Sequence, residues 1–188
     1  MNVIIDGAKH ILDPAGYDHI LFLIALVASF DLSKVWRVIL LATAFTVGHS
    51  LTLLLASIDF LRVDTGWVEF LIQVSIVIMA ITATLGVSID KSFNKIWAYC
   101  LTLGIGLIHG LGFSSYFRMH VDKGENILMP LVKFNLGVEV GQIIILLVAL
   151  SLFSMGRAMG VSVRHQQIFV GGLALGLSTL AAVQKFPL

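Results

Sequence analysis

Six long apolar runs, separated by short stretches that hold most of the charged residues, constrain this 188-residue chain more than any other feature. Hydrophobic residues make up 58% of the sequence and charged residues only 12%, whereas soluble domains carry about 25% charged residues. A transmembrane helix needs about 20 apolar residues. The runs therefore predict an all-α, polytopic bundle of transmembrane helices in a single domain over residues 1–188, and they exclude a water-soluble domain and a disordered chain.

The predicted spans end where charged residues interrupt the apolar runs. About six are expected, over residues 17–32, 35–58, 66–88, 96–117, 127–155 and 167–184. Residues 2–12 predict a short amphipathic helix at the membrane interface. Asp13 and Pro14 should end it, because proline disfavours a helical conformation at the residue before it. Three glycine pairs at a spacing of four are expected to be packing surfaces: Gly106 and Gly110, Gly137 and Gly141, Gly172 and Gly176.

The other totals narrow the class of protein. Twelve Lys and Arg residues against eleven Asp and Glu give no basic excess, so no nucleic-acid partner is expected. Cys100 is the only cysteine, which excludes intrachain disulfides and cysteine-clustered metal sites, and it should be a small buried residue. The first residues lack the basic-then-apolar layout of a signal peptide. Either the first helix directs insertion or a signal has been removed.

Charges in the loops predict how the chain lies in the membrane. The connections near 33–37, 89–95 and 156–165 hold six Lys and Arg residues, against three on the opposite face once Lys9 and Lys185 are set aside as terminal. Positive residues collect on the cytoplasmic side. These connections should therefore be cytoplasmic, and both termini should lie on the non-cytoplasmic side. The lipid bilayer is then a partner of the chain, and an oligomer or accessory subunit stays open.

Polar side chains inside the predicted spans indicate the functional site, because an ionisable group there costs about 2.5–3.5 kcal/mol. At about 1.5 Å per residue, His49 and His109 lie about 13 and 12 Å below the outer ends of their helices, and Glu139 about 18 Å. All of these groups are expected in the half of the membrane away from the cytoplasm. The candidates are Asp18, His19, His49, Glu69, Gln73, His109, Asn135, Glu139 and Gln142.

These candidates together predict a cation site. Asn135, Glu139 and Gln142 follow a spacing that places them on one helix face. Three carboxylates and three imidazoles at overlapping depths make a negative pocket. Nitrogen and carboxylate ligands without thiolate suit Ni²⁺, Co²⁺, Zn²⁺ or Cu²⁺ better than Mg²⁺ or Ca²⁺. For any one histidine taken singly, a hydrogen bond between helices is the competing interpretation.

Four separated stretches carry a family resemblance. They are Gly16-Tyr-Asp-His-Ile-Leu-Phe22, Ala44-Phe-Thr-Val-Gly-His-Ser-Leu-Thr52, Leu107-Ile-His-Gly-Leu-Gly-Phe113 and Phe134-Asn-Leu-Gly-Val-Glu-Val-Gly-Gln142. At these residues the chain resembles the second branch of the HupE/UreJ family of small integral membrane proteins, while the part beyond about 145 looks generic. The resemblance implies nickel or cobalt uptake across a bacterial inner membrane, and it adds His10 to the metal ligands.

The same ligands are compatible with more than one function. The leading hypothesis is a permease for a divalent transition-metal ion, without a nucleotide-binding loop to drive it. The alternative is an intramembrane zinc hydrolase with three histidine ligands and Glu139 or Glu69 as general base. A metal-storing or sensing subunit is a third possibility. The predicted spans offer few polar groups below Glu139, so the sequence does not predict an obvious inward path.

Overall fold

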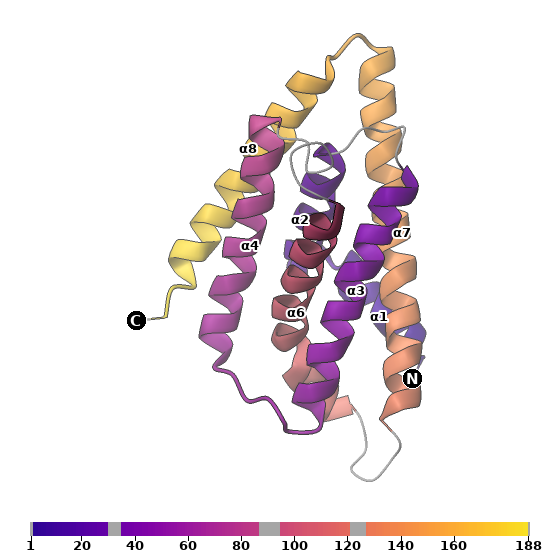
Figure 1. Ribbon diagram of the computed structural model, residues 1–188, viewed down its shortest axis with the longest axis vertical. Coiled ribbons are helices and arrows are strands. Elements are labelled where there is room, and N and C mark those ends of the chain that lie inside the picture. The colour runs from indigo at the N-terminus through magenta and orange to yellow at the C-terminus, as the bar shows by residue number, and fades with distance from the viewer. Residues whose placement is uncertain (1, 30–34, 87–94, 121–126, 188) are drawn as a thin grey trace.

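The computed structural model describes residues 2–29, 35–86, 95–120 and 127–187, and within these ranges it contains helices and turns but no strand. This confirms the all-α fold, and each predicted span corresponds to one helix (Figure 1). The elements are α1 (Val3–Leu12), the 3-10 turn η1 (Pro14–Gly16), α2 (Asp18–Ala28), α3 (Val35–Ser57), α4 (Thr65–Leu85), α6 (Lys95–His120), α7 (Leu128–Ala158) and α8 (Val163–Gln184).

Local sequence determines several helix ends. The predicted break at Asp13 and Pro14 is confirmed: α1 ends one residue earlier, and the Asp13 side chain accepts a hydrogen bond from the backbone N–H of Ala15 at 2.9 Å. Asp64 caps α4 in the same way, as acidic and hydroxyl side chains do at helix starts. The other end of α4 is closed by Gly86, whose φ of 66° lies in the left-handed region that glycine adopts without strain.

In the described part of the chain, five helices are long and apolar enough to cross a membrane: α3, α4, α7, α8 and the Ile96–Ser114 part of α6. The first predicted span is the exception. Instead of one helix over 17–32, α2 has 11 residues and ends at Ala28, which corresponds to about 16 Å, roughly half of the hydrocarbon core. Residues 30–34 lie outside the described residues. Within the described residues the helix is shorter than predicted, because the predicted span was extended past Ser29 to the apolar residue Leu32.

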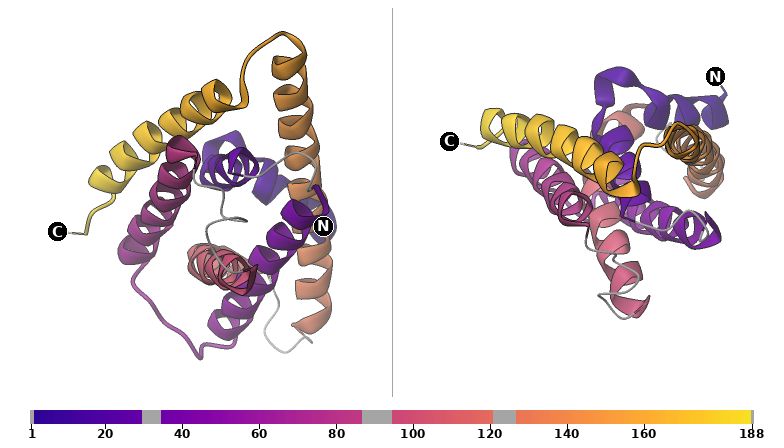
Figure 2. Two further views of the ribbon diagram at one scale, coloured as in Figure 1. Left: turned by 45° about the horizontal axis from the view of Figure 1, so that its top comes forward. Right: turned by 90° about the horizontal axis from the view of Figure 1, so that it is seen from above.

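The helices are arranged around α2, most of whose residues are buried. In Figure 1, α4 and α8 lie on one side of it and α3 and α7 on the other. Helix α3 packs along α6, and α4 packs along α8. Helix α1 contacts α7 and lies across the long axis of the bundle, as the view from above in Figure 2 shows. Its predicted place at the membrane interface stays a prediction.

Close glycine contacts hold two of these helix pairs together. A Cβ on Gly106 would lie 2.2 Å from the carbonyl oxygen of Phe45, and one on Gly110 would lie 2.2 Å from that of His49. A Cβ on Gly137 would lie 1.9 Å from a carbonyl oxygen of α1. The packing predicted for the first two glycine pairs is confirmed. Because Gly110 contacts His49 directly, the closeness of α3 and α6 also places a candidate ligand.

Two predictions about small residues are wrong. Gly172 and Gly176 have no neighbouring heavy atom within 4 Å of an added Cβ, whereas Gly171, one residue earlier, packs against Thr84 of α4. Cys100 is exposed rather than buried. Both errors have the same cause: residue type and spacing do not reveal which face of a transmembrane helix turns toward its neighbours.

The outer surface of the bundle is apolar, as expected for helices in contact with lipid. Large apolar side chains along the long helices are exposed. Trp36 and Trp97, at the starts of α3 and α6, are 77% and 66% exposed, and Trp67 at the start of the oppositely directed α4 is 48% exposed. Tryptophan collects at the two membrane–water interfaces. The exposed tryptophans therefore mark both ends of the membrane-spanning part.

Candidate metal centre

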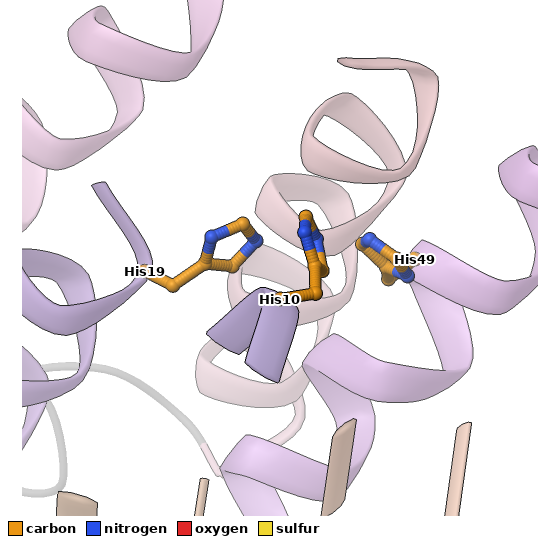
Figure 3. Close-up of side chains that lie close together, drawn as sticks. All are labelled: His10, His19 and His49. Carbon is orange, nitrogen blue, oxygen red and sulfur yellow. The ribbon is translucent and has the colours of Figure 1, made fainter. Parts of the chain in front are cut away.

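Four histidines and one aspartate from four helices converge inside the bundle. His10 lies near the end of α1, Asp18 and His19 begin α2, and His49 and His109 lie within α3 and α6. Figure 3 shows the His10 ring between those of His19 and His49. Its centroid is 4.7 Å from that of His19 and 5.7 Å from that of His49, and the rings of His19 and His109 are 5.1 Å apart.

The turn η1 brings His10 and His19 together. Along one continuous helix, nine residues would separate them by about 13 Å. Because α1 ends at Leu12 and the turn Pro14–Gly16 redirects the chain into α2, the two rings contact each other edge to face instead. The break predicted at Asp13 and Pro14 is therefore part of the site.

The histidine nitrogens are buried and largely without partners. His19, His49 and His109 are 5%, 0% and 1% exposed. Within the described part of the chain, no hydrogen-bond partner meets either ring nitrogen of His49, Nε2 of His19, Nδ1 of His109 or Nε2 of His10, and Nδ1 of His19 has only the Asp18 carboxylate beside it. Buried polar atoms are normally paired, since leaving one unpaired costs free energy. Lone pairs that converge without a protein partner are suited to a bound ion.

The ligand atoms form two overlapping groups. One atom from each of His10, His19 and His49 lies within 4.8 Å of the others, and the same holds for Asp18, His19 and His109. His19 belongs to both groups. Three ligands at this spacing match the open type of transition-metal site, in which protein supplies three ligands and leaves a position for exchange.

Ser75 of α4 fixes the tautomer of His109. The Ser75 hydroxyl donates its one proton to the carbonyl oxygen of Ile72 at 2.6 Å and lies 3.2 Å from Nε2 of His109. With its one proton directed at Ile72, by the shorter of the two contacts, the hydroxyl oxygen is placed to accept a proton from Nε2. This leaves the lone pair of His109 on Nδ1, the nitrogen that is buried without a partner. A second partner that orients a ligating imidazole is typical of metal sites.

Asp18 lies close enough to act on His19. One carboxylate oxygen lies 3.0 Å from Nδ1 of His19 and accepts a hydrogen bond from the His19 backbone N–H at 2.9 Å. The position of Asp18 in the first turn of α2 also places its negative charge at the positive end of the helix dipole. Asp18 can therefore either orient the His19 ring or bind an ion itself.

An acidic pocket leads to His10. A cavity of about 590 Å³ is lined by residues from α1, the turn after it and α6, namely Asp6, Lys9, His10, Leu12, Asp13, Pro14 and Phe113. Burial lowers the pKa of His10 well below its ordinary value, so its imidazole is neutral near pH 7 and offers a lone pair. The centroid of the Phe113 ring lies 3.8 Å from that of the His10 ring, with the two planes tilted by 38°. The pocket joins two carboxylates to a metal-binding type of side chain.

Glu139 and Gln142 lie outside these groups. Glu139 accepts a hydrogen bond from the hydroxyl of Thr43, and Gln142 accepts one from Thr46 at 3.0 Å. Both amide and carboxylate therefore face α3, on one side of α7 as their spacing predicts. Asn135, on the same helix, has a buried carbonyl oxygen without a partner in the described residues.

Glu69 is also apart from the histidines. Its carboxylate lies 3.4 Å from Nζ of Lys185 at the end of α8, and its side chain is 52% exposed. Gln73, one turn further along α4, is buried. The sequence could not reveal that Glu69 has Lys185, at the end of α8, as its neighbour instead of the histidines.

Sequence reasoning assigned no role to Ser75 or to the aromatic rings beside the histidines. The rings of Phe113 and Phe134 stack 5.1 Å apart, and Phe134 lies 6.5 Å from His49. A serine within the apolar run 66–88 was the available signal for Ser75. Phenylalanines in a transmembrane sequence carry no such signal, because most of them face lipid or the core.

Comparison with known proteins agrees with the resemblance in the sequence. The family model described as "HupE / UreJ protein" matches residues 1–184, so the chain belongs to the HupE/UreJ family and is an integral membrane protein. No curated protein and no solved structure matches it. The match continues through α8, so the interpretation of the part beyond about 145 as generic is wrong. Family membership extends over the whole helix bundle.

Proposed function

We propose that this member of the HupE/UreJ family is a membrane permease for a divalent transition-metal ion, with Ni²⁺ or Co²⁺ as the first candidates through the family resemblance. The observation that supports it best is the set of buried nitrogens on His10, His19, His49 and His109, which lack protein partners in the described residues and lie close to Asp18. A bound transition-metal ion satisfies these atoms.

The chemistry of the ligands selects the class of ion. Neutral imidazole suits Ni²⁺, Co²⁺, Zn²⁺ and Cu²⁺, whereas Mg²⁺ and Ca²⁺ prefer oxygen. Asp18 supplies one negative charge, so part of the ion's double charge stays uncompensated. That keeps binding exchangeable, which transport requires, because an ion held too tightly does not leave.

The proposed route begins at the acidic pocket. Asp6 and Asp13 attract a cation, and His10 connects their pocket to the other imidazoles. The side from which the ion approaches is the one away from the cytoplasm, in keeping with the orientation that the loop charges predict. Glu139 and its threonine partner on α3 offer the next carboxylate along the bundle.

Polar groups also lie at the opposite end of the short helix α2. The Ser29 hydroxyl lies 3.3 Å from that of Thr82, and the Gln167 amide donates to the carbonyl oxygen of Ala28 at 2.9 Å. The last carbonyls of a helix carry partial negative charge. Because α2 ends inside the bundle, these groups support an inward path that the sequence did not predict.

The test is uptake of Ni²⁺, Co²⁺, Zn²⁺ and Cu²⁺ into proteoliposomes by wild type, His109→Ala and Glu139→Gln. His165→Ala is the matched control, because His165 is exposed at the start of α8. We expect flux of at least one ion in wild type and the control, and at least a tenfold loss in the other two. Monodispersity in detergent checks that each variant folds. Equal flux in all four, or none in wild type, would refute the proposal.

The hydrolase alternative requires a glutamate beside the histidines as general base. The two glutamates considered for it, Glu139 and Glu69, instead contact Thr43 and Lys185. The geometry therefore favours transport over hydrolysis.

A further inference from the structure

The ligand atoms of the histidine cluster form two groups that share His19, and each group could hold a metal ion. The first consists of His10, His19 and His49, and the second of Asp18, His19 and His109. We propose that one ion passes from the first position to the second while His19 remains beside it. This inference rests on the proposed function and adds an order of events to it.

The shared ligand limits the cluster to one ion. A neutral imidazole has a single lone pair, so His19 serves one position at a time. Two divalent ions held within a few ångströms in a buried site would also repel each other strongly. Among the described residues, the groups of mutually close ligand atoms are these two triads rather than one set of five. The ion therefore occupies alternative positions.

The surroundings of the two positions give the direction. His10 lines the acidic pocket, so the first position faces the access route. Burial does not separate the two positions, since His49 of the first is 0% exposed and His109 of the second is 1% exposed; in the second position Ser75 also contacts His109. The second position also contains the Asp18 carboxylate, which attracts a divalent ion more than a third neutral imidazole does. An ion that enters through the pocket is thus drawn onward.

Asp18 has a different role at each step. With the ion in the first position, its carboxylate lies beside Nδ1 of His19 and orients the ring that binds the metal. With the ion in the second position, the same carboxylate is a ligand. The ion exchanges His10 and His49 for Asp18 and His109 but is never released into the apolar core. Stepwise exchange between adjacent positions keeps an ion bound and mobile.

The experiment compares variants that remove a ligand belonging to only one position with a variant that removes His19, the ligand common to both. Full-length protein in nanodiscs is titrated with Ni²⁺ by equilibrium dialysis, and X-ray absorption counts the ligands. His10→Ala tests the first position, Asp18→Asn the second and His19→Ala both, with His165→Ala as control. Asp18→Asn is nearly isosteric, whereas His10→Ala removes a ring that contacts Phe113 and Phe134, so monodispersity in detergent checks that each variant folds.

We expect one ion per chain in wild type and in the control. His10→Ala and Asp18→Asn should each retain one ion with about 10–100-fold weaker binding, and each should lose uptake. The metal in Asp18→Asn should have three imidazole ligands, and that in His10→Ala two imidazoles and a carboxylate. His19→Ala should lose binding by at least a further tenfold.

Two results would overturn the inference while leaving the permease intact. They are a wild type that transports and holds two ions per chain, and a transporting wild type in which His10→Ala or Asp18→Asn abolishes binding as completely as His19→Ala. The second result would mean a single five-ligand site. A wild type that neither binds nor transports any of the ions would instead overturn the proposed function itself.

Discussion

Ser75→Ala is the substitution that tests most directly how the bundle prepares a histidine for metal. Removing the hydroxyl leaves the Nε2–H of His109 without its partner at 3.2 Å, in a site where the ring is 1% exposed. An unsatisfied buried donor costs about 1–3 kcal/mol. The ring can lower that cost by moving its proton to Nδ1, but Nδ1 then no longer binds an ion. Loss of an orienting partner typically weakens metal binding about 10–100-fold, or about 1.4–2.8 kcal/mol.

A matched control separates this effect from the loss of a buried hydroxyl. Ser114 of α6 is also buried, and its hydroxyl donates to the carbonyl oxygen of Leu111 three residues earlier, as that of Ser75 donates to Ile72. Equilibrium dialysis with Ni²⁺ should show the 10–100-fold loss for Ser75→Ala and a change below about threefold for Ser114→Ala.

The tautomer itself can be read by NMR of ¹⁵N-labelled histidine. We expect the His109 proton on Nε2 in the metal-free wild type and a mixture of tautomers in Ser75→Ala. Wild-type affinity in Ser75→Ala, or an equal loss in Ser114→Ala, would refute the argument that Ser75 prepares the ligand.

Three further predictions concern packing, surface charge and pH. Gly110→Ala places a Cβ within 2.2 Å of the His49 carbonyl oxygen, so thermal unfolding should show a loss of about 1–3 kcal/mol in stability. Gly104→Ala is the control, because its Cβ would meet no heavy atom within 4 Å and should leave the stability unchanged. Glu69→Gln should leave uptake unchanged, because its ion pair is exposed and contributes only about 0–1 kcal/mol; a tenfold fall would place Glu69 on the route. Burial lowers the pKa of His10, so its imidazole loses its lone pair only when the pH falls through that lowered value. We therefore expect the affinity for Ni²⁺ to stay constant down to about pH 6. A steep fall in affinity between about pH 7 and 6 would contradict this.

The sequence predicts the long helices well because a membrane imposes both their length and their composition. The predicted span 35–58 corresponds to α3 at Val35–Ser57, and 66–88 to α4 at Thr65–Leu85. Depth along a helix is equally predictable, since each residue adds a constant rise. That is why His49 and His109, on different helices, could be placed at one level before the fold was known.

Rotation and neighbourhood are harder to predict. Glu139 and Glu69 have the depth expected of ligands, yet they contact Thr43 and Lys185. Which side chain a carboxylate meets depends on which helices are adjacent and how each is turned, and lipid offers no polarity that would orient an apolar helix. Depth alone therefore does not predict which carboxylates lie beside the histidines.

The short helix α2 shows most clearly what hydropathy cannot reveal. The helix ends at Ala28, directly before the polar residues Ser29 and Asp31, which a hydropathy average over the run 17–32 does not resolve. The site depends instead on where α2 begins, because α1 and α2 meet at the turn η1, which has no buried residue, and carry His10 and His19 near their facing ends. The long helices α3 and α6 supply His49 and His109 from their middles. The end of α1 and the start of α2 bring together the rings of His10 and His19, the Asp18 carboxylate and the positive end of a helix dipole. The ligands at helix ends are therefore those on which both metal positions depend.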